Sequence, residues 1–179
     1  MTKYIHFYFL IIFLTLCSFA HSVEMTDGTL IFTRQNGRQG WLAKGVEKHT
    51  GSKLLHVAIY IDGWVYESVI TGARRISFSE YMKHLNHKIT QHPRKKRVAE
   101  FVPPHTTYSY KQIEQMKEYA ESQRGRSYNF MGYIQNKEKR GIHCAQYIGN
   151  ILEKSGQYKS SNWKESPVKI YNWNFKNDT

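Results

Sequence analysis

The sequence contains few cysteines and few acidic residues, and it lacks internal repeats, low-complexity linkers, glycine-rich phosphate loops and zinc-ligand spacings. Without a repeat or a linker, its 179 residues, 40% of them apolar, predict one globular domain with a hydrophobic core. Without a phosphate loop or zinc spacing, they predict neither a metal nor another cofactor. Its 14 acidic residues against 26 Lys and Arg give a formal net charge of +12, which attracts polyanions.

One strongly apolar run stands near the start of the sequence. A lysine-bearing start, the run from Phe7 to Leu16 and the small-residue pattern Ala20-His21-Ser22 are together typical of a secretory signal peptide. We therefore expect residues 1–22 to be a signal peptide and residues 23–179 to form a single periplasmic or secreted domain. The expected polyanionic partners are then cell-envelope polymers and anionic lipids, and the compartment disfavours nucleic acid.

Two other interpretations of this start also place the domain outside the cytoplasm. The run could be an uncleaved membrane anchor, although it is short for a span of ~20 residues. Cys17 could carry a lipid, but Leu16 before it is too large for the usual pattern.

The expected elements follow from hydrophobic spacing and from turn residues. Asp62-Gly63 between two β-rich runs is a strong hairpin signal. We expect strands over 29–32 and 97–101, a hairpin over 54–68, and helices over 77–85, 109–123 and 144–154. Residues 35–52 are expected to form a loop or a loop with a short helix, and the tail beyond Gly156 has no clear pattern.

A two-residue turn at Asp62-Gly63 fixes the register of the hairpin. Ala58 then faces Glu67 and His56 faces Val69, so His56 and Glu67 are diagonal neighbours with Cβ atoms roughly 7 Å apart. Alternation places a mixed set on one face: His56, Ala58, Tyr60, Val65, Glu67 and Val69. The opposite, core-like face holds Leu55, Val57, Ile59, Ile61, Trp64 and Tyr66.

Cys144 is the only cysteine after the predicted signal peptide, so it has no partner for a disulfide within the mature chain. It stands at the start of a predicted helix, where unpaired N–H groups and the helix dipole favour thiolate over thiol. A glutamate beside a histidine can hold one ring nitrogen and leave the other free to act as a base. The sequence therefore predicts a triad of Cys144 as nucleophile, His56 as general base and acid, and Glu67 as the group that orients His56.

An oxyanion hole would complete such a site. The backbone N–H of Cys144 is one expected donor, and Tyr128 and Gln146 are candidates for the second. His143 adjoins Cys144, but neighbouring helix residues point about 100° apart, so we expect it to line the cleft or to cap the helix rather than to act as the base.

Five segments of the chain carry a resemblance to a known family. They are Asp27–Phe32, His56–Ile61, Glu67-Ser68, Arg126–Phe130 and His143–Ile148. These segments resemble the permuted papain-like amidases of the YaeF/YiiX type, relatives of the NlpC-type cell-wall peptidases, over about Asp27 to Gly156. The resemblance implies an α+β fold in which an antiparallel sheet or half-barrel packs against the helix bearing the nucleophilic cysteine. Two positions depart from the family, which often has aspartate at Asn129 and glycine at Ala58.

Three other clusters have two interpretations each. His84, His87 and His92 could ligate a metal, but a solvated loop is favoured because no carboxylate or cysteine cluster is near. Arg94, Lys95, Lys96 and Arg97 could bind an anionic envelope surface or form a solvated hairpin tip. Trp163, Tyr171, Trp173 and Phe175 could form a binding rim, although capping of the core is favoured.

The sequence thus favours an exported cysteine amidase or peptidase that forms a thioester at Cys144 and acts on cell-wall peptides. One alternative keeps the triad and changes the substrate to a lipid acyl chain, as in the related lecithin–retinol acyltransferase group. The other alternative is a non-catalytic module that binds the envelope and has an inert cysteine.

Overall fold

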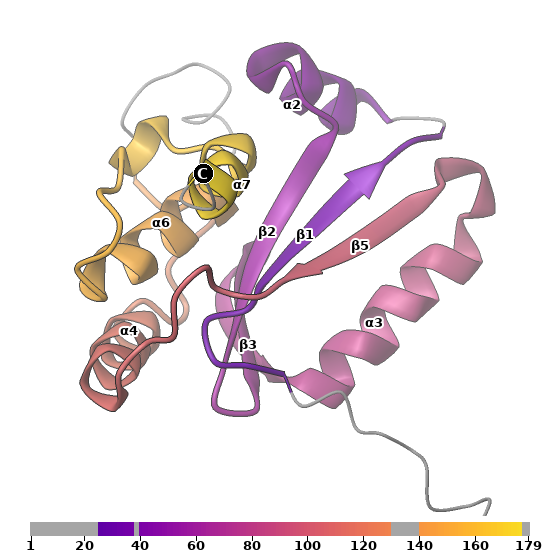
Figure 1. Ribbon diagram of the computed structural model, residues 1–179. Helices are drawn as coiled ribbons and strands as arrows, with labels where there is room; N and C mark the ends of the chain where they lie inside the picture. Colours follow the sequence, from indigo (N-terminus) through magenta and orange to yellow (C-terminus); the bar gives the residue numbers. More distant parts are fainter. Residues whose placement is uncertain (1–24, 38–39, 130–139, 177–179) are drawn as a thin grey trace, which may run out of the picture.

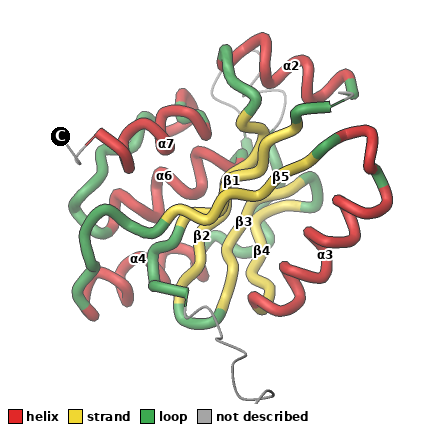
Figure 2. Tube along the Cα trace, turned by 45° about the vertical axis from the view of Figure 1, so that its right-hand side comes forward, coloured by secondary structure: helices red, strands yellow, loops and turns green. Residues whose placement is uncertain are grey.

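A five-stranded antiparallel sheet forms the centre of the protein, with helices on both of its faces (Figures 1 and 2). The computed structural model describes residues 25–37, 40–129 and 140–176, so the predicted signal peptide lies outside the described residues. The strands are β1 (Leu30–Gln35), β2 (Leu54–Ile61), β3 (Trp64–Val69), β4 (Gly72–Ser77) and β5 (Arg97–Val102), in the order β4-β3-β2-β1-β5. The helices are α2 (Trp41–Thr50), α3 (Phe78–Gln91), α4 (Tyr110–Ser122), α6 (Cys144–Lys154) and α7 (Pro167–Lys176). The predicted α+β class is confirmed.

The β2–β3 hairpin forms in the predicted register. Asp62 and Gly63 both have positive φ, 51° and 78°, as a tight two-residue turn of this kind requires. The ladder pairs Ile61 with Trp64 and continues to Ile59 and Tyr66.

One residue of the hairpin lies on the opposite side from the prediction. Opposite β1, Thr33 pairs with His56 but Arg34 pairs with Leu54, so Leu55 is an extra residue in β2. This irregularity turns Leu54 into the core, and Leu55 lines the same cavity as His56. The prediction that Leu55 belongs to the core face was wrong because the alternation of side chains breaks at this point.

The two faces of the sheet bury two separate hydrophobic clusters. The larger cluster lies between the sheet and helices α4, α6 and α7, and includes Val57, Ile59 and Tyr66. The smaller cluster lies between the sheet and α3, and includes Ala58, Val65 and Tyr81. Figure 2 shows α3 on one side of the sheet, α4, α6 and α7 together on the opposite side, and α2 at the upper end.

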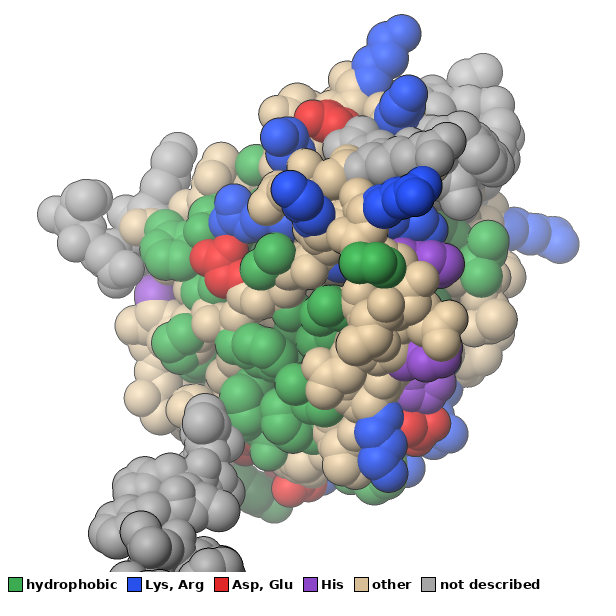
Figure 3. Space-filling view, turned by 90° about the vertical axis from the view of Figure 1, so that its right-hand side faces the viewer, with side chains coloured by type: hydrophobic (Ala, Val, Ile, Leu, Met, Phe, Trp, Pro, Cys, Tyr) green, Lys and Arg blue, Asp and Glu red, His purple; other side chains and the backbone are tan. Residues whose placement is uncertain are grey.

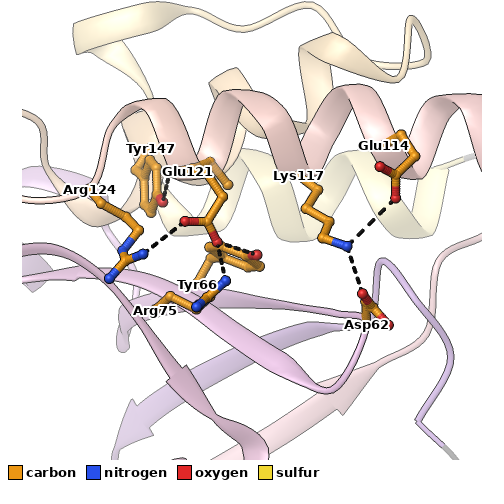
Figure 4. Close-up of polar contacts among 9 residues, drawn as sticks. Asp62, Tyr66, Arg75, Glu114, Lys117, Glu121, Arg124 and Tyr147 are labelled. Atoms are coloured by element: carbon orange, nitrogen blue, oxygen red, sulfur yellow. Dashed lines mark hydrogen bonds and ion pairs between the residues drawn. The ribbon is translucent and has the colours of Figure 1, made fainter.

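Polar contacts fix α4 against the hairpin (Figure 4). Glu121 accepts hydrogen bonds from Tyr66 at 2.9 Å and from Arg75 at 2.7 Å. One helical turn earlier on α4, Lys117 forms an ion pair with Asp62 of the hairpin turn at 2.7 Å. These contacts join the turn and strands β3 and β4 to one helix, which fixes the part of the sheet that carries Glu67.

Two elements differ from the prediction. Strand β4 was not predicted, because its connection to β3 presents the 80% exposed Ile70 instead of usual turn residues. Helix α3 continues to Gln91, so His84 and His87 lie on a helix and not in a loop. No metal-binding cluster of His, Cys, Asp or Glu occurs among the residues that the structure describes.

The connection after α3 is also different. Residues Pro93–Lys95 form a 3-10 turn, η1, between α3 and β5, so the basic segment is not the tip of a hairpin.

In the tail, Tyr171 packs edge-on against Phe32 and Trp173 packs against the larger core, which matches the capping interpretation. Within the described ranges, no helix is long and apolar enough to cross a membrane.

Replacement of a core residue of α4 tests this packing. Met116 is fully buried, so Met116→Ala should lower the free energy of unfolding by about 2–5 kcal/mol through lost contacts and a residual cavity. Tyr110→Ala is the matched control, because Tyr110 lies on the same helix but is 81% exposed, and it should change stability by less than about 0.5 kcal/mol. Urea denaturation measures both, and equal effects would contradict the assignment of α4 to the core.

Candidate active site

The three residues of the predicted triad come from three elements that meet at one end of the sheet. Cys144 is the first residue of α6, His56 lies on β2 and Glu67 lies on β3. His56 interacts with the Cys144 side chain, and His56 Nε2 lies 2.8 Å from Glu67 Oε2. The structure therefore brings together side chains that are 88 and 77 positions from Cys144 in the sequence.

The start of α6 is held by the segment before it. Ile142 donates its N–H to the Ser127 carbonyl at 2.8 Å, and its own carbonyl accepts from Ser68 Oγ of β3 at 2.7 Å. Gly141 has a φ of 102°, and a Cβ there would lie 2.7 Å from the Ser127 carbonyl oxygen, so only glycine fits. These contacts place Cys144 beside β3.

His143 caps the helix, as one of its two predicted roles requires. Its Nδ1 accepts the N–H of Gln146 at 3.2 Å, and its Nε2 lies 3.1 Å from the Trp163 carbonyl oxygen. The ring therefore carries its proton on Nε2 and uses Nδ1 as an acceptor. Both ring nitrogens of His143 therefore contact backbone groups at the start of α6 and before α7, which is the capping role.

Arg74 completes the chain of interactions and was not predicted. It lies on β4 directly opposite Glu67 and donates from Nε and Nη2 to Glu67 Oε1, at 2.9 and 2.5 Å. Glu67 is only 2% exposed, so its charge needs partners. One oxygen of Glu67 thus binds Arg74 and the other binds His56. Arg74 could not be predicted because strand β4 was not predicted, and only the pairing of β4 with β3 places Arg74 beside Glu67.

The charges in this chain alternate in sign, and the pKa values shift accordingly. Burial opposes ionisation of Cys144, but its interactions with His143 and His56 lower the pKa of its thiol to about 5. Burial likewise opposes the charged form of His56, yet Cys144 and Glu67 raise its pKa to about 10. Despite burial, His56 and Arg74 lower the pKa of Glu67 to about 2. These shifts favour a thiolate at Cys144, an imidazolium at His56 and a carboxylate at Glu67.

The two candidates for the second oxyanion donor occupy different positions. Tyr128 lines a cavity whose wall also contains His56 and Glu67. Gln146 is buried on the first turns of α6, and its amide nitrogen donates to Asn162 at 2.7 Å. Tyr128 is therefore the better placed of the two for contact with a molecule in the cavity.

The cavity lies on the α3 side of the sheet and has a volume of about 450 Å³. Sites for small molecules usually measure about 300–1,000 Å³. His56, Glu67 and Arg74 belong to its wall, so a bound molecule would contact the same imidazole that interacts with Cys144. Among the described residues, Cys144 itself does not line this cavity, so it is His56 that connects a bound molecule with the sulfur.

Comparison with known proteins gives no relative from which a function could be transferred. No protein-family model matches the sequence, and no curated protein matches it.

The pH dependence of alkylation tests the thiolate at Cys144. Iodoacetamide reacts with thiolate, and the lowered pKa means that thiolate persists at acid pH and disappears only below about pH 5. Alkylation of the Cys144 peptide, followed by mass spectrometry, should therefore stay at its plateau rate from pH 8 down to about pH 6. In His56→Ala the pH at which alkylation of Cys144 is half-maximal should move upward, because the thiolate loses its cationic partner. A wild-type midpoint near the ordinary thiol value of about 8.5 would contradict the ion pair.

Proposed function

We propose that this protein is a cysteine hydrolase that cleaves an acyl bond, most simply an amide, through a thioester at Cys144. The observation that carries this proposal is the connected series Cys144–His56–Glu67, with the sulfur at a helix N-terminus and Arg74 behind the carboxylate. A non-catalytic envelope-binding module would not need a partly buried histidine that is held by a carboxylate and interacts with the only described cysteine.

Each residue has one role in the reaction. Cys144 Sγ attacks the carbonyl carbon, and the backbone N–H of Cys144 donates to the oxygen that becomes negative. His56 gives its proton to the leaving nitrogen, so that the C–N bond breaks and an amine departs. His56, now neutral, then removes a proton from water, whose oxygen attacks the thioester carbon. The acid leaves, Cys144 returns to thiolate and His56 to imidazolium.

The fold we propose is the permuted papain-like one. Its support is the order of the elements, with the histidine on an early strand, β2, and the cysteine at the start of a late helix, α6, packed against β2 and β3. The resemblance to amidases of the YaeF/YiiX type and the signal-like residues 1–22 support export to the periplasm or beyond. The net charge of +12 suits substrates in an anionic envelope, of which cell-wall peptides are the class implied by the resemblance.

Substitution of the nucleophile tests the mechanism. Cys144→Ala should reduce hydrolysis of an acyl substrate by about a thousandfold or more, because no thioester can form, and His56→Ala should have a similar effect. Acid-quenched wild-type protein should carry the acyl group on Cys144 by mass spectrometry. Lys154→Gln is the control, because Lys154 lies at the exposed far end of the same helix, and it should leave turnover unchanged. Turnover that persists in Cys144→Ala would overturn the proposal.

The pH profile tests the positioning role of Arg74. For the wild type, kcat/KM should rise as Cys144 ionises near pH 5 and fall as His56 loses its proton near pH 10. Arg74 is one cause of the low pKa of Glu67, so Arg74→Gln should raise that pKa and allow Glu67 to be protonated at higher pH. The acid limb should then move upward, and Arg74→Lys should restore part of the shift. An unchanged acid limb in Arg74→Gln would show that Arg74 has a purely structural role.

A further inference from the structure

The cavity beside His56 contains a second group of charged residues far from the triad. Its wall begins at β3 and β4, with Glu67 and Arg74, and extends across the sheet to Arg97 at the start of β5. Lys88, near the end of α3, also lines it. The cavity therefore has one end with the proposed catalytic imidazole and another end with two cations.

The wall between these ends exposes more apolar than polar surface to the cavity, with Thr33 and Gln35 as the polar side chains that β1 contributes. Ala43 and Val46 come from α2, Leu55 from the irregularity in β2, and Leu85 from α3. The backbone groups of β1 beneath are paired with β2 and β5. A peptide backbone crossing this region would lose its hydrogen bonds with water and find few new partners, which is unfavourable. An unbranched hydrocarbon chain has no such cost and gains from burial.

The two cations at the far end have no acidic partner. Arg34, Arg74, Arg75, Lys117 and Arg124 each form an ion pair with a carboxylate. In the described part of the chain, neither Lys88 nor Arg97 lies within ion-pair distance of an acidic group. Figure 3, which views the α3 side, shows Lys and Arg gathered at the upper end, the level at which α2 and η1 lie in Figure 1. This end of the cavity favours an anion.

The strand order gives the distance between the two ends. His56 on β2 and Arg97 on β5 are separated by β1, which is two strand spacings or roughly 10 Å. An extended chain advances ~3.5 Å for the three backbone bonds of a residue, so a linear chain of about eight or nine bonds covers this distance.

We propose that the site acts on acyl compounds in which a linear aliphatic chain separates the reacting carbonyl from an anionic group. The chain lies along Val46, Leu55 and Leu85, and the anion binds Lys88 and Arg97. The inference rests on the proposed function, because the thiol and imidazole define which end of the substrate reacts. The steps at the carbonyl are those given above, with the anionic group unchanged.

Two matched substrates test this selectivity. One is the mono-para-nitrophenyl ester of octanedioic acid, which ends in a carboxylate, and the other is para-nitrophenyl octanoate, which ends in a methyl group. Wild-type kcat/KM should be about tenfold or more higher for the first, since charge-assisted contacts with Lys88 and Arg97 form only with the carboxylate. Equal values for the two substrates would overturn the inference.

Two double variants test whether Lys88 and Arg97 cause the preference for the ester that ends in a carboxylate. Lys88→Gln/Arg97→Gln should abolish it, whereas the control Lys83→Gln/Arg94→Gln removes one lysine and one arginine that do not line the cavity and should keep it. The single variant Lys88→Glu, at an exposed position of α3, should reduce the preference if the double variant is unstable. An equal loss in the control would assign the effect to net charge and overturn the site.

A binding measurement separates failure of this inference from failure of the proposed chemistry. Calorimetric titration should show octanedioate binding about tenfold more tightly than octanoate, and the difference should disappear in Lys88→Gln/Arg97→Gln. If that holds but Cys144 is never acylated, the anion site stands and the thiol mechanism is wrong. If Cys144 is acylated equally by both esters and both acids bind equally, the mechanism stands and the inference is wrong.

Discussion

The buried carboxylate of Glu67 is the group on which the arrangement of the site depends. It is almost fully removed from water, and a charge in that position is stable only with partners on both oxygens. Arg74 supplies one partner from β4 and His56 supplies the other from β2, so the carboxylate joins three adjacent strands. Because Glu67 holds Nε2 of the imidazole, Nδ1 is the nitrogen left for proton exchange with Cys144.

The rest of the fold brings the sulfur to that nitrogen. Helix α6 buries its apolar side against β2 and β3, and the contacts of Ile142 with Ser68 and Ser127 set where the helix begins. The cap by His143 satisfies a backbone N–H within the first turn, while the N–H of Cys144 itself stays at the helix end. The opposite face of the sheet, covered by α3, supplies the cavity. His56 connects the two sides, because its ring belongs to the cavity wall and also interacts with the Cys144 side chain.

The hairpin and the start of α6 could be predicted from the sequence, because turn residues and apolar spacing within a few positions determine them. The Asp62-Gly63 turn determines the register of the hairpin, and the register brings His56 to Glu67. The α6 helix and its first residue followed from apolar spacing. Leu55 could not be placed, because an extra residue in a strand leaves no mark in the alternation of apolar residues. Arg74 was missed because an exposed isoleucine occupies the β3–β4 connection, and the length of α3 was missed because its second half is polar and exposed.

The protonation state of His56 tests the central claim most directly, since a thiolate at Cys144 and an imidazolium at His56 imply one another. Nitrogen NMR of histidine-labelled protein reports whether both ring nitrogens carry protons. Both His56 nitrogens should be protonated at pH 7, and the ring should titrate only near pH 10. A His56 ring that is neutral at pH 7 and titrates near the ordinary value of about 6.5 would contradict it.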